Sequence, residues 1–145
     1  MENPWKKFVP QSPTRQGSAE YFTGLVYISE LIHSPAPMSL QVYRVMFTPG
    51  ARTAWHTHPK GQILHVESGI GWFQRRGEGV LEIKAGDTVY IPPGEEHWHG
   101  ASATHAMVHL ALQASQEGVT AHWLEHVSDE EYKLSTTPPP PGRPR

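Results

Sequence analysis

Glycine and proline interrupt the central part of this sequence about every eight to twelve residues, a spacing typical of all-β domains. Between the interruptions, from Leu25 to Gln113, stand short runs of β-branched, aromatic and apolar residues. No apolar set of helical period longer than about ten residues breaks the pattern. Such a sequence has room for short strands and tight turns only, which predicts an all-β antiparallel sandwich or barrel.

The apolar runs define the expected strands. The turns between them carry pairs such as Pro49-Gly50, whose backbone preferences suit a turn. The expected strands span Leu25–Ile32, Leu40–Phe47, Ala51–His56, Gln62–Ser68, Gly71–Gln74, Gly79–Ile83, Thr88–Ile91, His97–Gly100 and Ala106–Gln113.

Both ends of the chain differ from this central region. Residues 1–24 are rich in Pro, Gln, Ser and Gly and predict an extended arm rather than a packed element. The barrel with its C-terminal extension is expected over residues 25–134. It ends in a short helix, because Ser128 and Glu131 have the spacing of a capping box. Residues 135–145 contain four consecutive prolines and predict a disordered tail, with a ligand for an SH3-type domain as the less favoured alternative.

The composition excludes several kinds of site and partner. The chain has 0 Cys, so disulfides and thiolate ligands are excluded, and any metal must bind nitrogen and oxygen. A formal charge of −2 without blocks of like charge gives no reason to expect nucleic acid. No apolar run approaches the roughly 20 residues of a membrane helix, and the first residues do not resemble a signal peptide. We therefore expect a cytoplasmic protein without a membrane partner.

Histidine is unusually frequent in this chain, with 10 residues. His56 and His58 are two positions apart at the end of an expected strand, so both imidazoles point to one face and can reach one ion. After the following turn, Gln62 points inward if Leu64 and Val66 line the barrel. These three side chains are therefore candidate metal ligands.

The chain resembles the cupin superfamily in two segments that correspond to the two motifs of that family. The first segment runs from Gly50 through His56, His58 and Gln62 to Gly69, and the second runs from Gly86 through Pro92 and Gly94 to His97.

The resemblance implies a single-domain jelly-roll β-barrel in which His56, His58 and His97 bind a metal together with residue 62. Gln62 stands where the family usually has glutamate, and Ala101 stands where it usually has asparagine. Three imidazoles and an amide contribute no negative charge, so a divalent ion keeps its full charge and remains a strong Lewis acid. This set differs from the two-histidine, one-carboxylate triad of many iron oxygenases. The alternative, turn and surface histidines without a common partner, suits any single histidine but not this combination.

Within the superfamily, the chain resembles the bacterial cupin hydroxynitrile lyases over most of its length, from Tyr21 to Tyr132. This resemblance implies one divalent ion per chain, with Mn²⁺ or Fe²⁺ favoured and Zn, Co and Ni possible. It also implies cleavage or formation of aromatic cyanohydrins such as mandelonitrile, with His99 as the base. The segments that carry it are Pro49–Pro59, Pro93–Ala101 and His122–Tyr132.

The residues around the expected metal suggest a small-molecule cavity with apolar walls and a few polar groups. His99 lies two residues beyond His97 and faces the same cavity if the strand continues. With an ordinary pKa of about 6.5, an imidazole that binds no metal can accept a proton near neutral pH. For His109 and Gln113, a hydrogen-bonded interior pair is the open alternative to a substrate contact. The expected substrate pocket consists of Tyr43, Val45, Phe47, His109 and Gln113.

Two other functions remain open on the sequence, because fold alone does not determine activity. One is an Fe(II)-dependent dioxygenase, which would consume oxygen. The other is a non-catalytic sensor or binding module, which would bind a small molecule without turnover. We also expect a homodimer or homotetramer, with apolar contacts from Tyr21-Phe22 and from exposed faces that carry Trp55, Ile63 and Trp98.

Overall fold

The computed structural model describes residues 8–134, and the proline-rich tail predicted for 135–145 lies outside them. Within this range the protein is built from strands, with one short helix at the C-terminal end. The strands are β1 (Arg15–Gln16), β2 (Phe22–Thr23), β3 (Val26–His33), β4 (Leu40–Phe47), β5 (Arg52–Thr53), β6 (His56–Thr57), β7 (Gln62–Arg75), β8 (Leu81–Lys84), β9 (Thr88–Ile91), β10 (His97–Ala101), β11 (Met107–Ala114) and β12 (His122–Trp123), and the helix is α1 (Asp129–Leu134).

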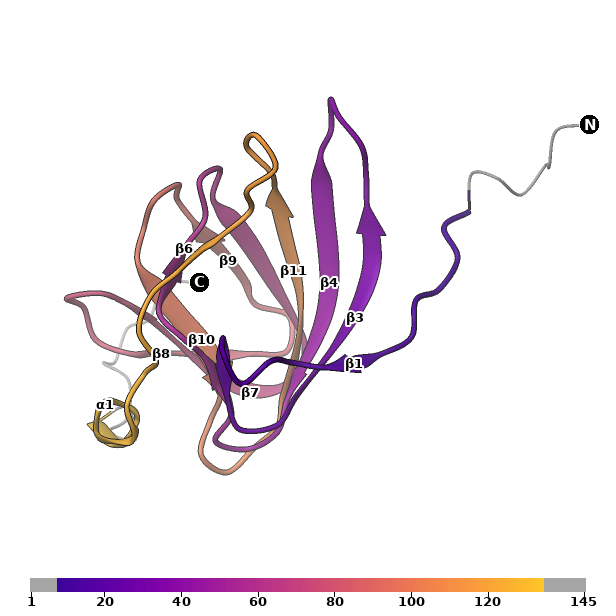
Figure 1. The fold of residues 1–145 in the computed structure, drawn as a ribbon. Coiled ribbons are helices and arrows are strands. Elements are labelled where there is room, and N and C mark those ends of the chain that lie inside the picture. Colours follow the sequence, from indigo (N-terminus) through magenta and orange to yellow (C-terminus); the bar gives the residue numbers. More distant parts are fainter. Residues whose placement is uncertain (1–7, 135–145) are drawn as a thin grey trace, which may run out of the picture.

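The strands form one curled antiparallel sheet in the order β1-β3-β4-β11-β7-β10-β5-β2 (Figure 1). β6 pairs with β10 and β12, while β8 and β9 pair with β7. The all-β fold predicted from the sequence is therefore confirmed. No helix in residues 8–134 is long and apolar enough to cross a membrane.

The long strand β7 connects the two parts of the curl. Its first residues pair with β11 and β9, and its last residues pair with β10 and β8. The sequence predicted two separate strands here, but the chain continues through the intervening Gly69. That residue has a φ of 82°, and a Cβ placed there would overlap the carbonyl oxygen of Ala106. Only glycine therefore fits the point at which β7 passes from one part of the sheet to the other.

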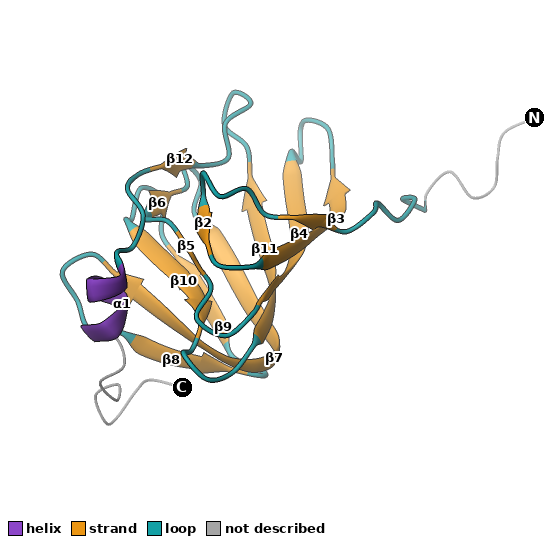
Figure 2. Ribbon diagram, turned by 60° about the horizontal axis from the view of Figure 1, so that its bottom comes forward, coloured by secondary structure: helices purple, strands orange, loops and turns teal. Residues whose placement is uncertain are grey.

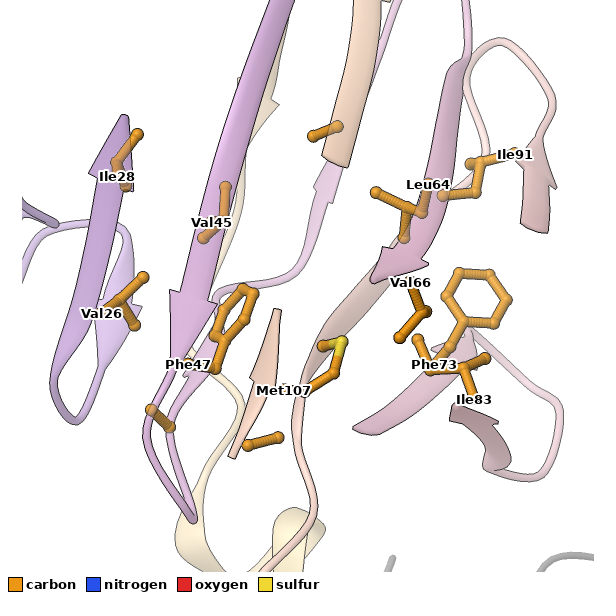
Figure 3. Packing of buried hydrophobic residues seen from close by; sticks show 13 residues of the cluster. Val26, Ile28, Val45, Phe47, Leu64, Val66, Phe73, Ile83, Ile91 and Met107 are labelled. Carbon is orange, nitrogen blue, oxygen red and sulfur yellow. The ribbon is translucent and has the colours of Figure 1, made fainter. Parts of the chain in front are cut away.

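The apolar core fills the inside of the curl. In β11, buried and partly exposed residues alternate along all eight positions, so Met107, His109, Ala111 and Gln113 point inward as the sequence predicted. Buried side chains from β3, β4, β7, β8 and β9 complete this core. Figure 3 labels ten of its members: Val26, Ile28, Val45, Phe47, Leu64, Val66, Phe73, Ile83, Ile91 and Met107.

A second apolar cluster packs beneath α1, where the Tyr132 ring contacts those of Trp72 and Trp98. Figure 2 shows α1 beside the sheet. Trp55 and Trp98 belong to it together with Val127 and Tyr132, and they are only 3% and 0% exposed. The expectation that these two tryptophans lie on exposed faces is therefore wrong. Ile63 is 41% exposed, as expected. Assembly into a homodimer or homotetramer stays a prediction.

The N-terminal arm, predicted as extended, pairs with the sheet at two places. Arg15–Gln16 pairs with β3, and Phe22–Thr23 pairs with β5. Two-residue strands carry no periodic pattern, so periodicity could not predict these pairings. At the other end the capping box is confirmed. The backbone N–H of Ser128 donates to Glu131 Oε1, and the N–H of Glu131 donates to Ser128 Oγ.

The bend at Gly69 leads to a stability prediction. We expect Gly69→Ala to destabilise the protein far more than Gly77→Ala, measured as the free energy of unfolding in urea. Both glycines have positive φ, so alanine at either position costs about 1–2 kcal/mol of backbone strain. A Cβ on Gly77 meets no atom within 4 Å, whereas one on Gly69 overlaps backbone. Equal losses in the two variants would contradict this account of β7.

Candidate metal centre

Four imidazoles converge inside the curled sheet. His56 lies on β6 and His58 directly after it, while His97 and His99 lie on β10, where His97 is the register partner of His56. The ring centroid of His56 lies 5.0 Å from that of His58, 4.2 Å from that of His97 and 5.3 Å from that of His99. One ring nitrogen each from His56, His97 and His99 lies within 4.8 Å of the others. These three buried histidines could together hold a metal ion.

Backbone carbonyls fix the proton on three of these rings. The Nδ1 atoms of His56, His58 and His97 lie 2.9, 2.6 and 2.9 Å from the carbonyl oxygens of Ala54, Thr120 and Glu95. A carbonyl can only accept, so each Nδ1 carries the hydrogen and each Nε2 of a neutral ring keeps its lone pair. This is the tautomer of a histidine that binds a metal through Nε2.

Gln62 presents another lone pair to the same point. Its Nε2 donates to Gln113 Oε1 at 2.9 Å, which leaves its Oε1 3.2 Å from Nε2 of His97. Both of these facing atoms are acceptors, so they repel each other unless a cation or a donor lies between them. The Nε2 of His58 is also buried and has no hydrogen-bond partner among the described residues. Such orphaned nitrogen and oxygen atoms fit a divalent cation.

His99 has different partners from the other three rings. Its Nδ1 lies 3.0 Å from Nε2 of His109, and its backbone N–H donates to the hydroxyl of Thr53. Its own Nε2 is buried without a hydrogen-bond partner in residues 8–134. Which ring nitrogen of His99 carries the proton therefore depends on another imidazole rather than on a carbonyl.

Burial keeps all these rings neutral. Loss of hydration is the main cause that lowers the pKa of His56 and His99 well below 6.5, and repulsion between neighbouring rings adds to it. Burial lowers the pKa of His97 to about 3 and that of His109 to about 4. An ordinary pKa for His99, as expected from the sequence, is therefore wrong, because the sequence does not reveal how completely the ring is buried.

A cavity of about 290 Å³ opens beside these histidines. Its lining includes His56, His58, Gln62 and His99. It also includes all five residues that the sequence placed in the pocket, namely Tyr43, Val45, Phe47, His109 and Gln113.

The sequence analysis missed the lining residues that come from the two ends of the described chain. The arm contributes Arg15, Ser18, Tyr21 and Phe22. The segment after β11 contributes Thr120, Ala121 and Trp123. The aromatic pair Tyr21-Phe22 is the one available signal, because two adjacent aromatic residues in an otherwise polar arm favour contact with an apolar surface.

Comparisons with known proteins agree with this geometry. A model of the cupin domain matches residues 43–112. An (R)-mandelonitrile lyase from Granulicella tundricola is 50% identical over 127 residues, which cover 88% of this chain and 97% of that protein. A cupin-like protein from Thermotoga maritima superposes with a TM-score of 0.80 at 43% identity, over 84% of this chain and 92% of that one. A predicted oxalate decarboxylase from the same organism has a TM-score of 0.61 at 25% identity, over 68% of this chain and 89% of that one.

The buried rings predict a pH dependence of stability. Between pH 6.5 and about 4, the unfolded chain protonates its histidines, while His97 and His109 stay neutral in the folded protein. Stability present above pH 6.5 is therefore lost as the pH falls, by about 1.4 kcal/mol per pH unit for each such ring. Urea unfolding of chelator-treated protein between pH 7.5 and 5 measures this slope. The variant His109→Phe should have a smaller slope, reduced by the contribution of one ring. A free energy of unfolding that stays constant over this range would contradict the burial effect.

Proposed function

The chain belongs to the cupin family, and we propose that it is a metal-dependent lyase that cleaves or forms cyanohydrins of aromatic aldehydes. The observation that carries the proposal is a cluster of neutral imidazoles at the wall of a mainly apolar cavity, in a chain half identical to a mandelonitrile lyase. The relative's name supports an enzyme of the lyase class. The cyanohydrin reaction, the choice of metal and the roles of the residues are our proposal.

The proposed ligands are His56, His58, Gln62 and His97. The three histidines share one hydrogen-bonding pattern, in which Nδ1 donates to a backbone carbonyl and Nε2 of the neutral ring keeps its lone pair. His99 is also close enough to bind, but its Nδ1 faces His109 instead of a carbonyl. This difference favours His58 over His99 as the ligand. The uncharged donor set admits Mn²⁺ or Fe²⁺, with Zn²⁺, Co²⁺ and Ni²⁺ as alternatives.

When bound, a divalent ion supplies Lewis-acid stabilisation of negative charge on a substrate oxygen. The protein's own contribution begins with His99. For this ring to act as base, its Nδ1 must donate to Nε2 of His109, which leaves the lone pair on the unpartnered Nε2. His99 then takes the hydroxyl proton of the cyanohydrin, the bond between the carbinol carbon and the nitrile carbon breaks, and aldehyde and cyanide form.

The lowered pKa of His99 fits the second half of this reaction. A buried imidazolium is unstable, and cyanide is a stronger base than the ring, so the proton passes to cyanide and hydrogen cyanide leaves. The same steps in reverse form the cyanohydrin. Tyr43, Val45 and Phe47 line the cavity and contact the aryl group in this proposal. Tyr43 is bulky, so a compact aromatic substrate is expected.

The proposal is tested by separating metal content from turnover. We expect His99→Ala to keep its metal but to lose about 10²–10⁴-fold in benzaldehyde release from mandelonitrile, because acid–base help of this kind is removed. His58→Ala should lose both the metal and the activity. Metal analysis of the purified variants and an ultraviolet assay after Mn²⁺ or Fe²⁺ loading measure the two properties.

Three results would contradict parts of this assignment. Unchanged turnover in His99→Ala would refute the assignment of His99 as the base. If His99→Ala lost the metal while His58→Ala retained it, His99 would be the ligand and His58 would not. Oxygen uptake by the Fe²⁺-loaded protein without benzaldehyde release from mandelonitrile would favour a dioxygenase instead.

A further inference from the structure

Segments from both ends of the described chain hold the strand that carries His56. β6 has only two residues, so it cannot fix its own position. In the sheet it lies between β10 and β12, and Trp123 of β12 is the register partner of His56. Just before β6, the backbone N–H of Ala54 donates to the carbonyl of Tyr21 in the arm at 2.8 Å. The position of His56 therefore depends on contacts from residues far away in sequence.

Trp123 also contacts the His56 ring directly. The indole stacks on the imidazole with centroids 4.5 Å apart and an interplanar angle of 29°. The phenol of Tyr21 stacks on the same indole at 4.5 Å and 21°. Trp123 therefore joins the arm to a proposed metal ligand. It belongs to neither buried core cluster, so packing of the core does not account for this arrangement.

The same short segment reaches a second proposed ligand. Three residues before Trp123, the carbonyl of Thr120 accepts the hydrogen bond from Nδ1 of His58. The segment is anchored beyond Trp123 by Arg52, which is buried and donates to the carbonyl of Val127 and to Asp129, both at 2.8 Å. These contacts hold residues 120–129 against the barrel.

We propose that Trp123 is a positioning residue for His56, so that metal affinity depends on the segment that follows the barrel. This inference rests on the metal centre proposed above. The Ala54 carbonyl fixes where Nδ1 of His56 points, but a single hydrogen bond still lets the ring tilt about that contact. The indole face opposes this tilt and directs Nε2 toward Nε2 of His97. Loss of such outer contacts around a ligand typically weakens metal binding 10–100-fold.

The test compares two substitutions of Trp123, one that keeps an aromatic ring against the His56 imidazole and one that does not. Trp123→Leu keeps apolar volume but removes the aromatic face, and we expect it to raise the Kd for Mn²⁺ by about 10-fold or more in calorimetric titrations of the full chain. Trp123→Phe keeps an aromatic ring and should restore most of the affinity. Trp72→Phe is the matched control, because Trp72 lies in the buried cluster beneath α1. It should lower the Tm without changing the Kd for Mn²⁺.

A second measurement does not need the metal. The indole ring current shifts the NMR signals of the His56 ring protons, so Trp123→Leu should move these signals in metal-free protein, whereas Trp72→Phe should not. If Trp123→Leu binds Mn²⁺ within twofold of the wild type, the positioning inference is wrong and the metal centre stands. If the wild type binds none of Mn²⁺, Fe²⁺, Zn²⁺, Co²⁺ and Ni²⁺, the metal centre is wrong, and unmoved His56 signals would then overturn the positioning role as well.

Discussion

Three hydrogen bonds from imidazoles to backbone carbonyls determine what this site can do. In each, a ring Nδ1 donates to an oxygen that cannot donate in return, so the lone pair lies on Nε2, away from the backbone. Burial makes the protonated form of each ring costly, so the lone pairs persist well below neutral pH. Hydrogen bonds to the backbone thus orient these nitrogen atoms so that their lone pairs could bind a cation.

The fold brings these carbonyls and rings together by curling one sheet rather than by stacking separate elements. Because β7 continues through Gly69, its first residue, Gln62, lies on one part of the curl, while its last residues pair with β10, which carries His97. The pairing of β10 with β6 then places His97 opposite His56. A shift of one residue in either pairing would turn a proposed ligand to the other face of the sheet.

Much of this arrangement could be predicted from the sequence because it depends on local periodicity. Alternation along β11 placed His109 and Gln113 inside, and the two-residue spacing of His56 and His58 gave them a common face. The burial of Trp55 could not be predicted, because it depends on residues distant in sequence: the Arg76 guanidinium lies over its ring, and Val127 and Tyr132 belong to the same cluster. The pKa of His99 depends in the same way on surroundings that several strands provide.

The two ends of the described chain line the cavity from outside the range of the cupin domain model. The cupin domain model covers residues 43–112, which include the proposed ligands and His99. The arm residues Arg15 to Phe22 and the segment Thr120 to Trp123 lie outside that range, yet both line the cavity. Substitutions there change the shape of the cavity without replacing a proposed ligand. In this chain the segment also contacts His56 and His58, so one segment both lines the cavity and holds two of the buried imidazoles.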